Sequence, residues 1–146
     1  MKLVTIQASA IKSTFEVLKD ILNDVNVYFK EDGMYVTSLD TARVALVDVF
    51  LSADNFDEYE CLQPIIAGIN ITNTFKLLKT ITNNDVLRLS VDSKEFMDIE
   101  IKSESKKTTT RFQLKLLDIN ENRIEVPTQN MMTVTTMQSA EFQRMC

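Results

Sequence analysis

The chain has 146 residues, of which 45% are apolar and 25% charged, with only two Gly and two Pro. These values are typical of one globular domain, and they exclude a long flexible linker or a low-complexity tract. No apolar run approaches the length of a membrane span, and the net charge of −5 excludes attraction to nucleic acid over the whole surface.

The first half of the chain predicts a strand, a helix and three more strands. Residues 2–7 alternate as a strand does, and apolar residues at helical spacing then predict a helix from Ser9, its N-cap, to about Asn23. Asp32-Gly33 supplies turn chemistry between the strands that follow. We expect the last strand to be buried on most of its length and residues 54–60 to form an acidic loop. The three β-rich runs are residues 25–29, 34–39 and 44–51.

The second half repeats this order. Residues 65–69 predict a strand and residues 71–79 a helix, and strands follow at residues 85–91, 96–102 and 110–117. The sequence ITNTFKLLKTITNN (71–84) echoes IKSTFEVLKDILND (11–24), with identity at seven of the first thirteen positions. The echo predicts a duplicated β-α-β-β-β unit, an α+β fold in which two helices pack on one face of an antiparallel sheet.

Lysines recur beside the apolar stripes of both predicted helices. On a helical wheel Lys12, Lys19 and Lys79 lie roughly 80–100° from the stripe, and Lys76 lies further out. Taken alone, this pattern favours a solvated helix face. Two helices side by side would instead combine the lysines into a common basic surface. A further basic run occupies residues 102–115.

The chain lacks the residues on which several kinds of active site depend. It has no His, which excludes Ser-His-Asp and Cys-His nucleophilic systems, and its two Gly exclude a phosphate-binding glycine loop. Cys61 and Cys146 are 85 positions apart in the sequence, which does not match the ligand spacing of a zinc site. Because the chain shows no secretion signal, we expect both thiols to be reduced. The acidic residues 54–60 lack the ligand spacing of a calcium loop. We therefore expect no enzyme activity, no metal and no cofactor.

Four stretches of the chain stand out: FEVLKDILNDVNVYFKEDGMYVTSLDTARVALVDVFL, GINITNTFKLLK, FQLKLLDIN and VPTQ. Together they resemble the eukaryotic-type DNA sliding clamp, proliferating cell nuclear antigen, and the similarity runs from about Met1 to Cys146. In that family a subunit has two such domains, and three subunits close head to tail into a ring around duplex DNA. The resemblance implies a polymerase processivity factor whose helices line the hole and whose sheets form the outer wall.

The resemblance also implies a surface that faces DNA. Its basic side chains would attract phosphates loosely and without regard to sequence, so that the ring slides. Carried over residue by residue, the DNA-facing positions are Lys12, Lys19, Lys76, Lys79, Lys115 and Arg144.

A groove for partner peptides is the second implied site. Family clamps bind peptides of the form Gln-x-x-aliphatic-x-x-aromatic-aromatic beneath the connector between their domains. Arg43 departs from the less charged residue usual at its position, which leaves partner preference open. The alternative for Val44 and Leu46 is that one of them is a buried core residue and does not line the groove. The matching positions are Leu39, Arg43, Val44, Leu46, Ile124, Val126 and Pro127.

A third implied surface is the last strand of the first domain. In the family this edge strand pairs with the second domain of the neighbouring subunit. The matching residues are Thr108, Thr109, Thr110, Arg111, Phe112, Gln113, Leu114, Lys115 and Leu116.

The resemblance divides the chain into a first clamp domain at residues 1–117, an interdomain connector at 118–129 and the start of a second clamp domain at 130–146. Two interpretations of this division stay open. The chain is a fragment of a longer protein, which we favour, or it is a one-domain clamp that assembles six copies. In either case we expect that the 146-residue chain alone does not encircle DNA as the family does.

The implied partners follow from the same resemblance. They are duplex DNA, DNA polymerase and other replication and repair enzymes that carry clamp-binding peptides, a clamp loader, and two further copies of the full-length chain. The implied location is the nucleus, or a viral replication site in the cytoplasm if the source is a large DNA virus. The alternative function is a non-ring processivity factor that binds DNA as a monomer, or an adaptor. Such a monomer would need a stronger basic patch, and its DNA binding would fall steeply with salt.

Overall fold

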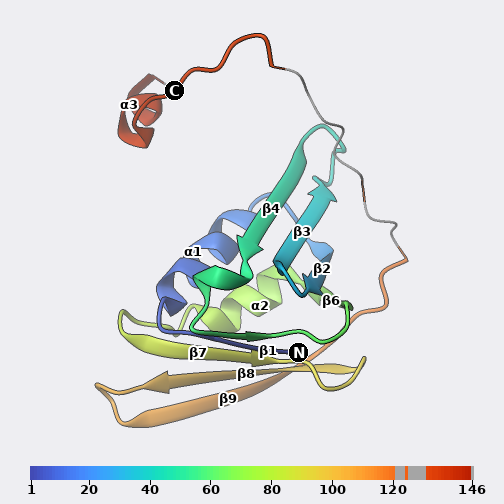
Figure 1. The fold of residues 1–146 in the computed structure, drawn as a ribbon, viewed down its shortest axis with the longest axis vertical. Helices are drawn as coiled ribbons and strands as arrows, with labels where there is room; N and C mark the ends of the chain where they lie inside the picture. Colours follow the sequence, from blue (N-terminus) through green and yellow to red (C-terminus); the bar gives the residue numbers. More distant parts are fainter. Residues whose placement is uncertain (121–123, 125–130, 146) are drawn as a thin grey trace.

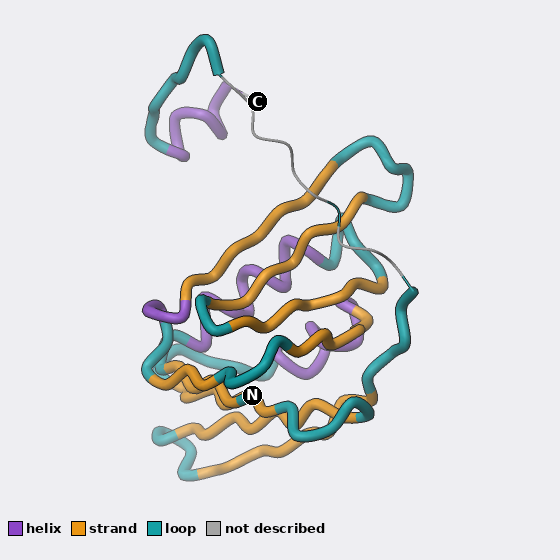
Figure 2. Tube along the Cα trace, turned by 45° about the vertical axis from the view of Figure 1, so that its right-hand side comes forward, coloured by secondary structure: helices purple, strands orange, loops and turns teal. Residues whose placement is uncertain are grey.

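The computed structural model of the protein describes residues 1–120, 124 and 131–145. Within them two antiparallel sheets meet at an angle, and two helices pack side by side between the sheets (Figure 1). The second view shows both helices on the same side of the strands (Figure 2). The α+β class that the sequence predicts is confirmed.

The elements follow the predicted repeat. The first unit comprises β1 (Lys2–Thr5), α1 (Ala8–Leu18), β2 (Asp24–Lys30), β3 (Gly33–Leu39) and β4 (Leu46–Ser52). The second unit comprises β6 (Ile65–Asn70), α2 (Ile71–Leu78), β7 (Asp85–Ser90), β8 (Phe96–Ser103) and β9 (Thr108–Lys115). Between the units lie a 3-10 turn, η1 (Ala53–Asn55), and the short strand β5 (Glu58–Glu60). The last described element is α3 (Ser139–Met145).

The two units exchange their first strands. The described strands form a larger sheet of order β5-β1-β7-β8-β9 and a smaller sheet of order β4-β3-β2-β6. β1 of the first unit therefore pairs with β7 of the second, and β6 of the second unit pairs with β2 of the first. The repeat yields two sheets instead of the single sheet that we expected, because the first strand of each unit completes the sheet of the other.

Apolar residues at helical spacing hold the helices against the sheets. Ile11, Phe15 and Leu18 on α1 are buried, as are Ile71 and Leu78 on α2. These side chains share one continuous core with the inward-facing residues of the strands. Burial of each such side chain contributes roughly 1.5–3 kcal/mol, so the common core keeps the helices in contact with each other and with both sheets.

The first helix is shorter than predicted. It begins one residue before its predicted cap, Ser9, and it ends at Leu18 instead of near Asn23. Beyond Leu18 the chain continues in 3-10-type turns, in which the Ile21 N–H donates to the Leu18 carbonyl oxygen at 3.1 Å. Leu22 is still buried, so the apolar spacing behind the prediction continues past the end of the helix.

Two predictions about residues 44–60 are wrong. β4 is not buried, because it is an edge strand that packs on the core with one face, and its side chains alternate between exposed and half-buried. Residues 58–60, predicted to lie in an acidic loop, form β5 and pair with β1. Tyr59 turns inward there, and its hydroxyl lies 2.7 Å from the carbonyl oxygen of Lys30 and 2.8 Å from that of Gly33.

The chain leaves β9 by crossing β6 at a glycine. Leu117 donates its backbone N–H to the Gly68 carbonyl oxygen at 2.8 Å, and Asn26 Nδ2 donates to the Ile119 carbonyl oxygen at 3.1 Å. A Cβ atom on Gly68 would lie 2.1 Å from the Leu117 carbonyl oxygen, far inside van der Waals contact. Glycine is therefore required for residues 117–119 to cross the strand at this point.

Substituting Gly68→Ala tests this crossing. The methyl group would displace residues 117–119, so we expect the free energy of unfolding to fall by about 1–3 kcal/mol and the Leu117 amide to exchange faster. Urea denaturation and hydrogen exchange measure the two effects. Ile66→Ala, on the same face of the same strand, is the control and should change stability by less than about 0.5 kcal/mol. If the Gly68→Ala chain were as stable as wild type, the claim that glycine is required where residues 117–119 cross β6 would be wrong.

Candidate nucleic-acid interface

α1 carries two of the predicted basic residues, and both reach toward α2. Lys12 Nζ donates to the Ile81 carbonyl oxygen at 3.0 Å. Lys19 Nζ lies 5.5 Å from the centroid of the Phe75 ring and 2.5 Å from Asp20 Oδ1. Both ammonium groups therefore lie at the seam between the two helices.

α2 supplies two more lysines, and these are exposed. Lys76 Nζ donates to Asn73 Oδ1 at 3.3 Å within the helix, and Lys79 occupies the C-cap. The helix dipole favours positive charge at this end. Because α1 and α2 lie side by side, the structure brings four of the six predicted DNA-facing residues to one pair of helices.

Lys115 does not join this surface, contrary to the expectation from the resemblance. It pairs in register with Phe96, whereas Phe112 and Leu114 on the same strand pack against the core. Successive side chains of a strand point to opposite faces, so Lys115 lies on the face of the larger sheet away from the helices. Arg144 lies on α3, whose residues are all exposed, and the structure does not bring it to the helix lysines.

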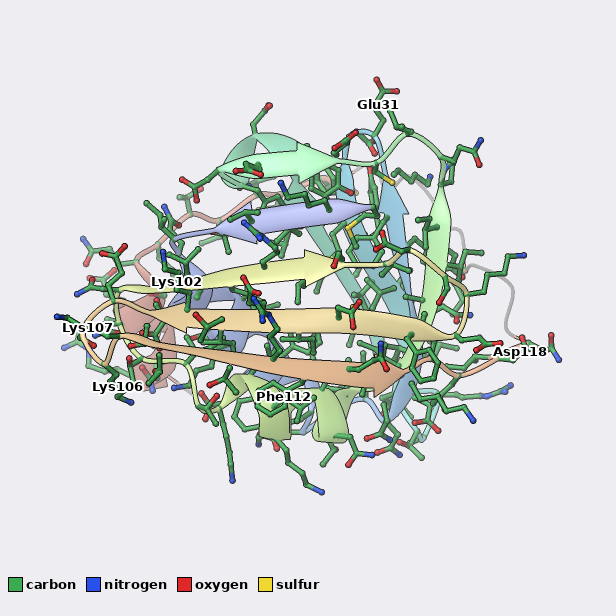
Figure 3. All side chains as sticks on the ribbon, turned by 90° about the horizontal axis from the view of Figure 1, so that it is seen from below. Glu31, Lys102, Lys106, Lys107, Phe112 and Asp118 are labelled. Carbon is green, nitrogen blue, oxygen red and sulfur yellow. The ribbon has the colours of Figure 1, made fainter. Side chains whose placement is uncertain are left out.

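The basic run at residues 102–115 is also divided by the fold. Lys102, Lys106 and Lys107 gather at one end of the larger sheet, at the turn between β8 and β9 (Figure 3). Arg111 instead lies on the outer face of the sheet, where its Nε atom is 2.6 Å from Glu100 Oε2. The fold therefore separates the run into a group of lysines at the turn and residues on the outer face of the sheet, of which Arg111 is paired with a carboxylate.

A residue that the sequence analysis did not single out organises the end of α2. Asp85 is buried, and its Oδ2 accepts hydrogen bonds from the backbone N–H and the hydroxyl of Thr82 at 2.8 and 2.9 Å. Burial alone would raise the pKa of this carboxyl group, but hydrogen bonds from Thr82 and Ser103, and the charge of Lys106, lower the pKa below its ordinary value of 3.8. Asp85 thus fixes the loop that receives Lys12. The pattern in the sequence that could have predicted this loop is a Thr three residues before an Asp, shortly after the end of a helix.

The predicted groove residues of the smaller sheet lie together. Leu39 and Leu46 are register partners at the ends of β3 and β4. Asp40 closes the loop between them, because its Oδ1 accepts the N–H groups of Val44 and Ala45 at 2.7 and 3.0 Å. These bonds, the one from Ala45 first, lower the pKa of Asp40. Val44 is 86% exposed and Leu46 40% exposed, so neither residue is core, and the alternative that one of them is buried is wrong.

The other groove residues are partly described. Arg43 stands in the same loop with a φ of 57°, in the left-handed region that few residues other than Gly adopt. Ile124 is half-buried. Val126 and Pro127 lie outside the described residues, so the connector side of the groove stays a prediction.

The edge position predicted for β9 is confirmed, since in the described part of the chain β9 pairs with β8 alone. Just beyond β9, the Leu116 N–H donates back toward β8, to the Glu95 carbonyl oxygen at 2.7 Å. Hydrogen-bonding direction alternates along an antiparallel strand, so the N–H groups of Arg111 and Gln113 point to the open edge. β4, the equivalent strand of the first unit, forms an edge of the smaller sheet, and nothing in its residue pattern marks it as a contact surface.

The rest of the described structure holds few reactive groups. Burial raises the pKa of the Cys61 thiol, which is free. In residues 1–120, 124 and 131–145, no three residues among His, Cys, Asp and Glu gather closely enough to hold a metal ion. No helix of these residues is long and apolar enough to cross a membrane.

Comparison with known proteins indicates one family for this chain. Residues 1–124 match the family model for the N-terminal domain of proliferating cell nuclear antigen. The chain is 35% identical over 144 residues to the "probable DNA polymerase sliding clamp 1" of Paramecium bursaria Chlorella virus 1, an alignment that covers 97% of this chain and 55% of that protein. It is 31% identical over 139 residues to the proliferating cell nuclear antigen of Chaetomium thermophilum. That alignment covers 94% of this chain and 54% of the relative. The chain thus spans about half the length of the relatives that it matches.

Asp85→Asn tests how the loop after α2 is held. Because the pKa of Asp85 is lower in the folded state than in the unfolded state, its stabilising effect is present above the unfolded pKa and is lost as pH falls through the folded pKa. We expect the variant to lose about 1–3 kcal/mol of unfolding free energy at neutral pH, and the difference from wild type to shrink below about pH 4.

Urea denaturation across the acidic range measures this difference. Asp92→Asn, which changes an exposed carboxylate, is the matched control and should leave the stability nearly unchanged. A difference between Asp85→Asn and wild type that stays constant with pH would contradict the assignment of the effect to the carboxylate charge.

Proposed function

The chain belongs to the proliferating cell nuclear antigen family, and from that premise we propose that it forms the first part of a DNA sliding clamp, a polymerase processivity factor whose ring encircles duplex DNA. The observation that carries the proposal is the helix pair, which gathers Lys12, Lys19, Lys76 and Lys79 on a chain of net charge −5. A local basic surface on an acidic protein attracts phosphates where it faces DNA and repels them elsewhere.

The four lysines suit a contact that slides. Lys76 and Lys79 are exposed at the end of α2, and the two lysines of α1 are held by the helix seam instead of being directed at one point. The ammonium groups of Lys76 and Lys79 can contact phosphates without reading base sequence, so the duplex can move past them, and the held lysines of α1 add positive charge beside them. Arg144 would extend this surface from the second domain, whereas Lys115 belongs to the outer wall.

Ring closure would use the open sheet edges. We assign residues 1–117 to the first clamp domain, residues 118–129 to the connector and residues 130–146 to the opening of a second domain of the same kind. The unpaired edge of β9 supports a main-chain contact with the neighbouring subunit, and β4 offers an equivalent edge at the other side of the domain. The full-length gene product would then form a homotrimer.

The partners would dock on the groove beside the connector. Val44 and Leu46 are apolar, exposed and held in place by the Asp40 loop, which suits a surface for an aliphatic or aromatic anchor. We propose that DNA polymerase and other replication and repair enzymes bind there through clamp-binding peptides, and that a clamp loader opens the ring. The location would be the nucleus, or a viral replication site.

Catalysis has no part in this proposal, because a clamp tethers enzymes by encircling DNA. The second candidate is a non-ring processivity factor or adaptor that binds as a monomer. The solution mass of the full-length product distinguishes the two, since a ring requires several copies.

Lys76→Glu/Lys79→Glu tests the DNA-facing surface. We expect the affinity of the full-length product for duplex DNA at low salt to fall about tenfold, with a shallower salt dependence, because phosphate contacts are lost. Fluorescence anisotropy of a labelled duplex measures both quantities.

Lys102→Glu/Lys115→Glu is the matched control for this double variant. It makes the same change in charge on the larger sheet, away from the helices, and should change the affinity less than about twofold. Equal losses in the two double variants would contradict a helix-based surface and would indicate a response to net charge alone.

Gln113→Pro tests the edge contact. Proline removes the N–H group that points to the open edge and leaves the pairing of β9 with β8 intact, so the trimer of the full-length product should dissociate. Light scattering behind a sizing column measures the mass. Gln113→Thr, which loses the same side chain and keeps the N–H, should remain trimeric. A trimeric Gln113→Pro protein would contradict the contact, and a monomeric wild type would favour the second candidate function.

A further inference from the structure

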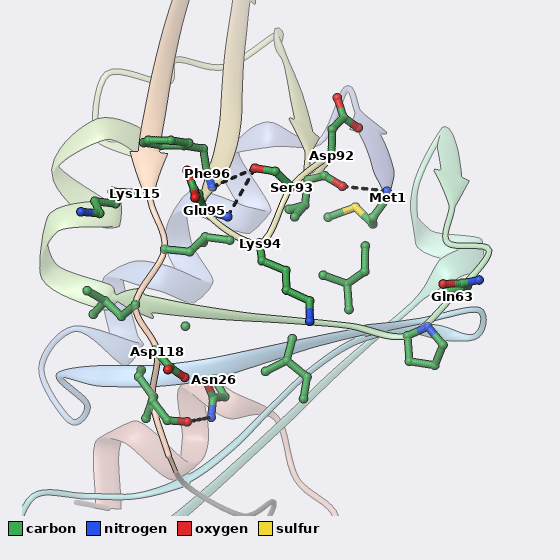
Figure 4. Close-up of a pocket in the computed structure, with 18 of the residues that line it drawn as sticks. Met1, Asn26, Gln63, Asp92, Ser93, Lys94, Glu95, Phe96, Lys115 and Asp118 are labelled. Carbon is green, nitrogen blue, oxygen red and sulfur yellow. Dashed lines mark hydrogen bonds between the residues drawn. The ribbon is translucent and has the colours of Figure 1, made fainter.

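We propose that a cleft at the end of the larger sheet binds a second kind of partner segment, an extended apolar peptide that carries a carboxylate. The cleft has a volume of about 1480 Å³ and is lined by parts of residues 60–66, 91–96 and 115–119 (Figure 4). None of the groove residues Leu39, Val44 and Leu46 lines it, so the site is separate from the proposed connector groove.

Exposed aliphatic side chains give the cleft its apolar character. Leu62 is 88% exposed, Ile66 60% and Leu117 41%, and all three line the cleft. Large aliphatic side chains that are left in water and gathered at one concave site mark a surface that gains free energy when it is covered. The cleft is therefore suited to the apolar side chains of a partner.

The backbone of β6 adds a free edge to this site. The Gly68 carbonyl oxygen points away from β2, because it accepts from the Leu117 N–H. In an antiparallel pair residues two apart point the same way, so the N–H and C=O groups of Ile66 also point away from β2, where the described part of the chain gives them no backbone partner. Pro64 has no N–H and ends the edge, so the strand that fits here is short.

The larger sheet shows which kind of strand pairs with an edge like that of β6. β1 is the equivalent first strand of the other unit, and its outer edge is covered by β5, three residues that run antiparallel to it. The outer edge of β6 meets the chain at one bridge only, Gly68 with Leu117, before residues 118–119 cross the sheet. A short antiparallel strand is thus the occupant for which the fold already contains a template.

One charge selects the chemistry of that strand. Lys94 extends into the cleft among apolar side chains (Figure 4), and it has no ion pair within the described residues, whereas Lys2 at the rim is 2.5 Å from Glu58. Lys94 is exposed, so its ammonium group is free to bind a carboxylate by a charge-assisted hydrogen bond beside the aliphatic side chains. Acidic residues also line the cleft, but Asp92 and Glu95 are directed away from Lys94 (Figure 4).

The same acidic residues disfavour a nucleic acid in this cleft. Four carboxylates line it and balance three lysines and the Met1 ammonium group, so the cleft offers a chain of phosphates no net positive charge. A peptide with one carboxylate needs a single cation, which Lys94 supplies. The occupant is therefore a partner protein's extended segment with aliphatic residues on either side of a Glu or Asp.

A short peptide tests the proposal on the 146-residue chain. The probe is acetyl-Ile-Leu-Glu-Ile-Leu-amide, titrated into the 15N-labelled chain while amide chemical shifts are recorded. We expect saturable shifts at Ile66, Lys94 and Leu117. The same peptide with Gln in place of Glu should bind about tenfold more weakly, and with Lys in place of Glu more weakly still.

Two protein variants and a matched control complete the test. Lys94→Glu should weaken binding of the Glu peptide about tenfold and restore binding of the Lys peptide. Ile66→Ser should weaken both peptides by loss of apolar contact. Lys107→Glu makes the same charge change at the β8–β9 turn and should leave both affinities unchanged.

Several results would overturn the proposal. The first is an absence of shifts at these three amides in a folded chain at millimolar peptide, and the second is an equal effect of Lys94→Glu and Lys107→Glu. Shifts confined to Leu39, Val44 and Leu46 would place the peptide in the connector groove instead. Shifts at the cleft caused by a DNA duplex and not by the peptide would assign the cleft to nucleic acid.

Discussion

The exchange of first strands between the two repeated units is the constraint on which the rest of the structure depends. β1 hydrogen-bonds to β7 and β6 to β2, so that neither unit can complete a sheet from its own strands. The two sheets are therefore joined through both units, and α1 and α2 must share the space between them. This shared space, more than any contact between lysines, explains why residues sixty positions apart in the sequence present one basic surface.

The same exchange decides which strand edges stay open. It places the last strand of each unit, β4 and β9, at an outer edge of its sheet. The first strands β1 and β6 keep one outer edge each, and here the pseudo-symmetry is incomplete, because β5 covers the edge of β1 whereas Leu117 touches β6 once. The open edges and the cleft are thus consequences of one topological feature together with this departure from symmetry.

The lysine positions differ in what holds them. Lys12 and Lys19 are fixed by the Ile81 carbonyl oxygen and the Phe75 ring, which ties their charge to the packing of the helices. Lys76 and Lys79 depend on the end of α2, whose following loop Asp85 holds in place. A buried carboxylate that carries no surface function therefore supports the geometry of the proposed DNA-facing surface.

The sequence by itself determined the repeated elements and the inward faces of both helices, because the spacing of apolar residues fixes which side of a helix or strand can be buried. It could not determine the strand partners, since hydrogen bonding between strands joins residues far apart in the chain. That pairing left Leu46 on an edge strand, turned part of the acidic loop into β5 and placed Lys115 on the sheet face away from the helices. Tertiary structure decided these points because an apolar pattern states only that one face can be covered, whereas packing decides which face is covered and by which strand or helix.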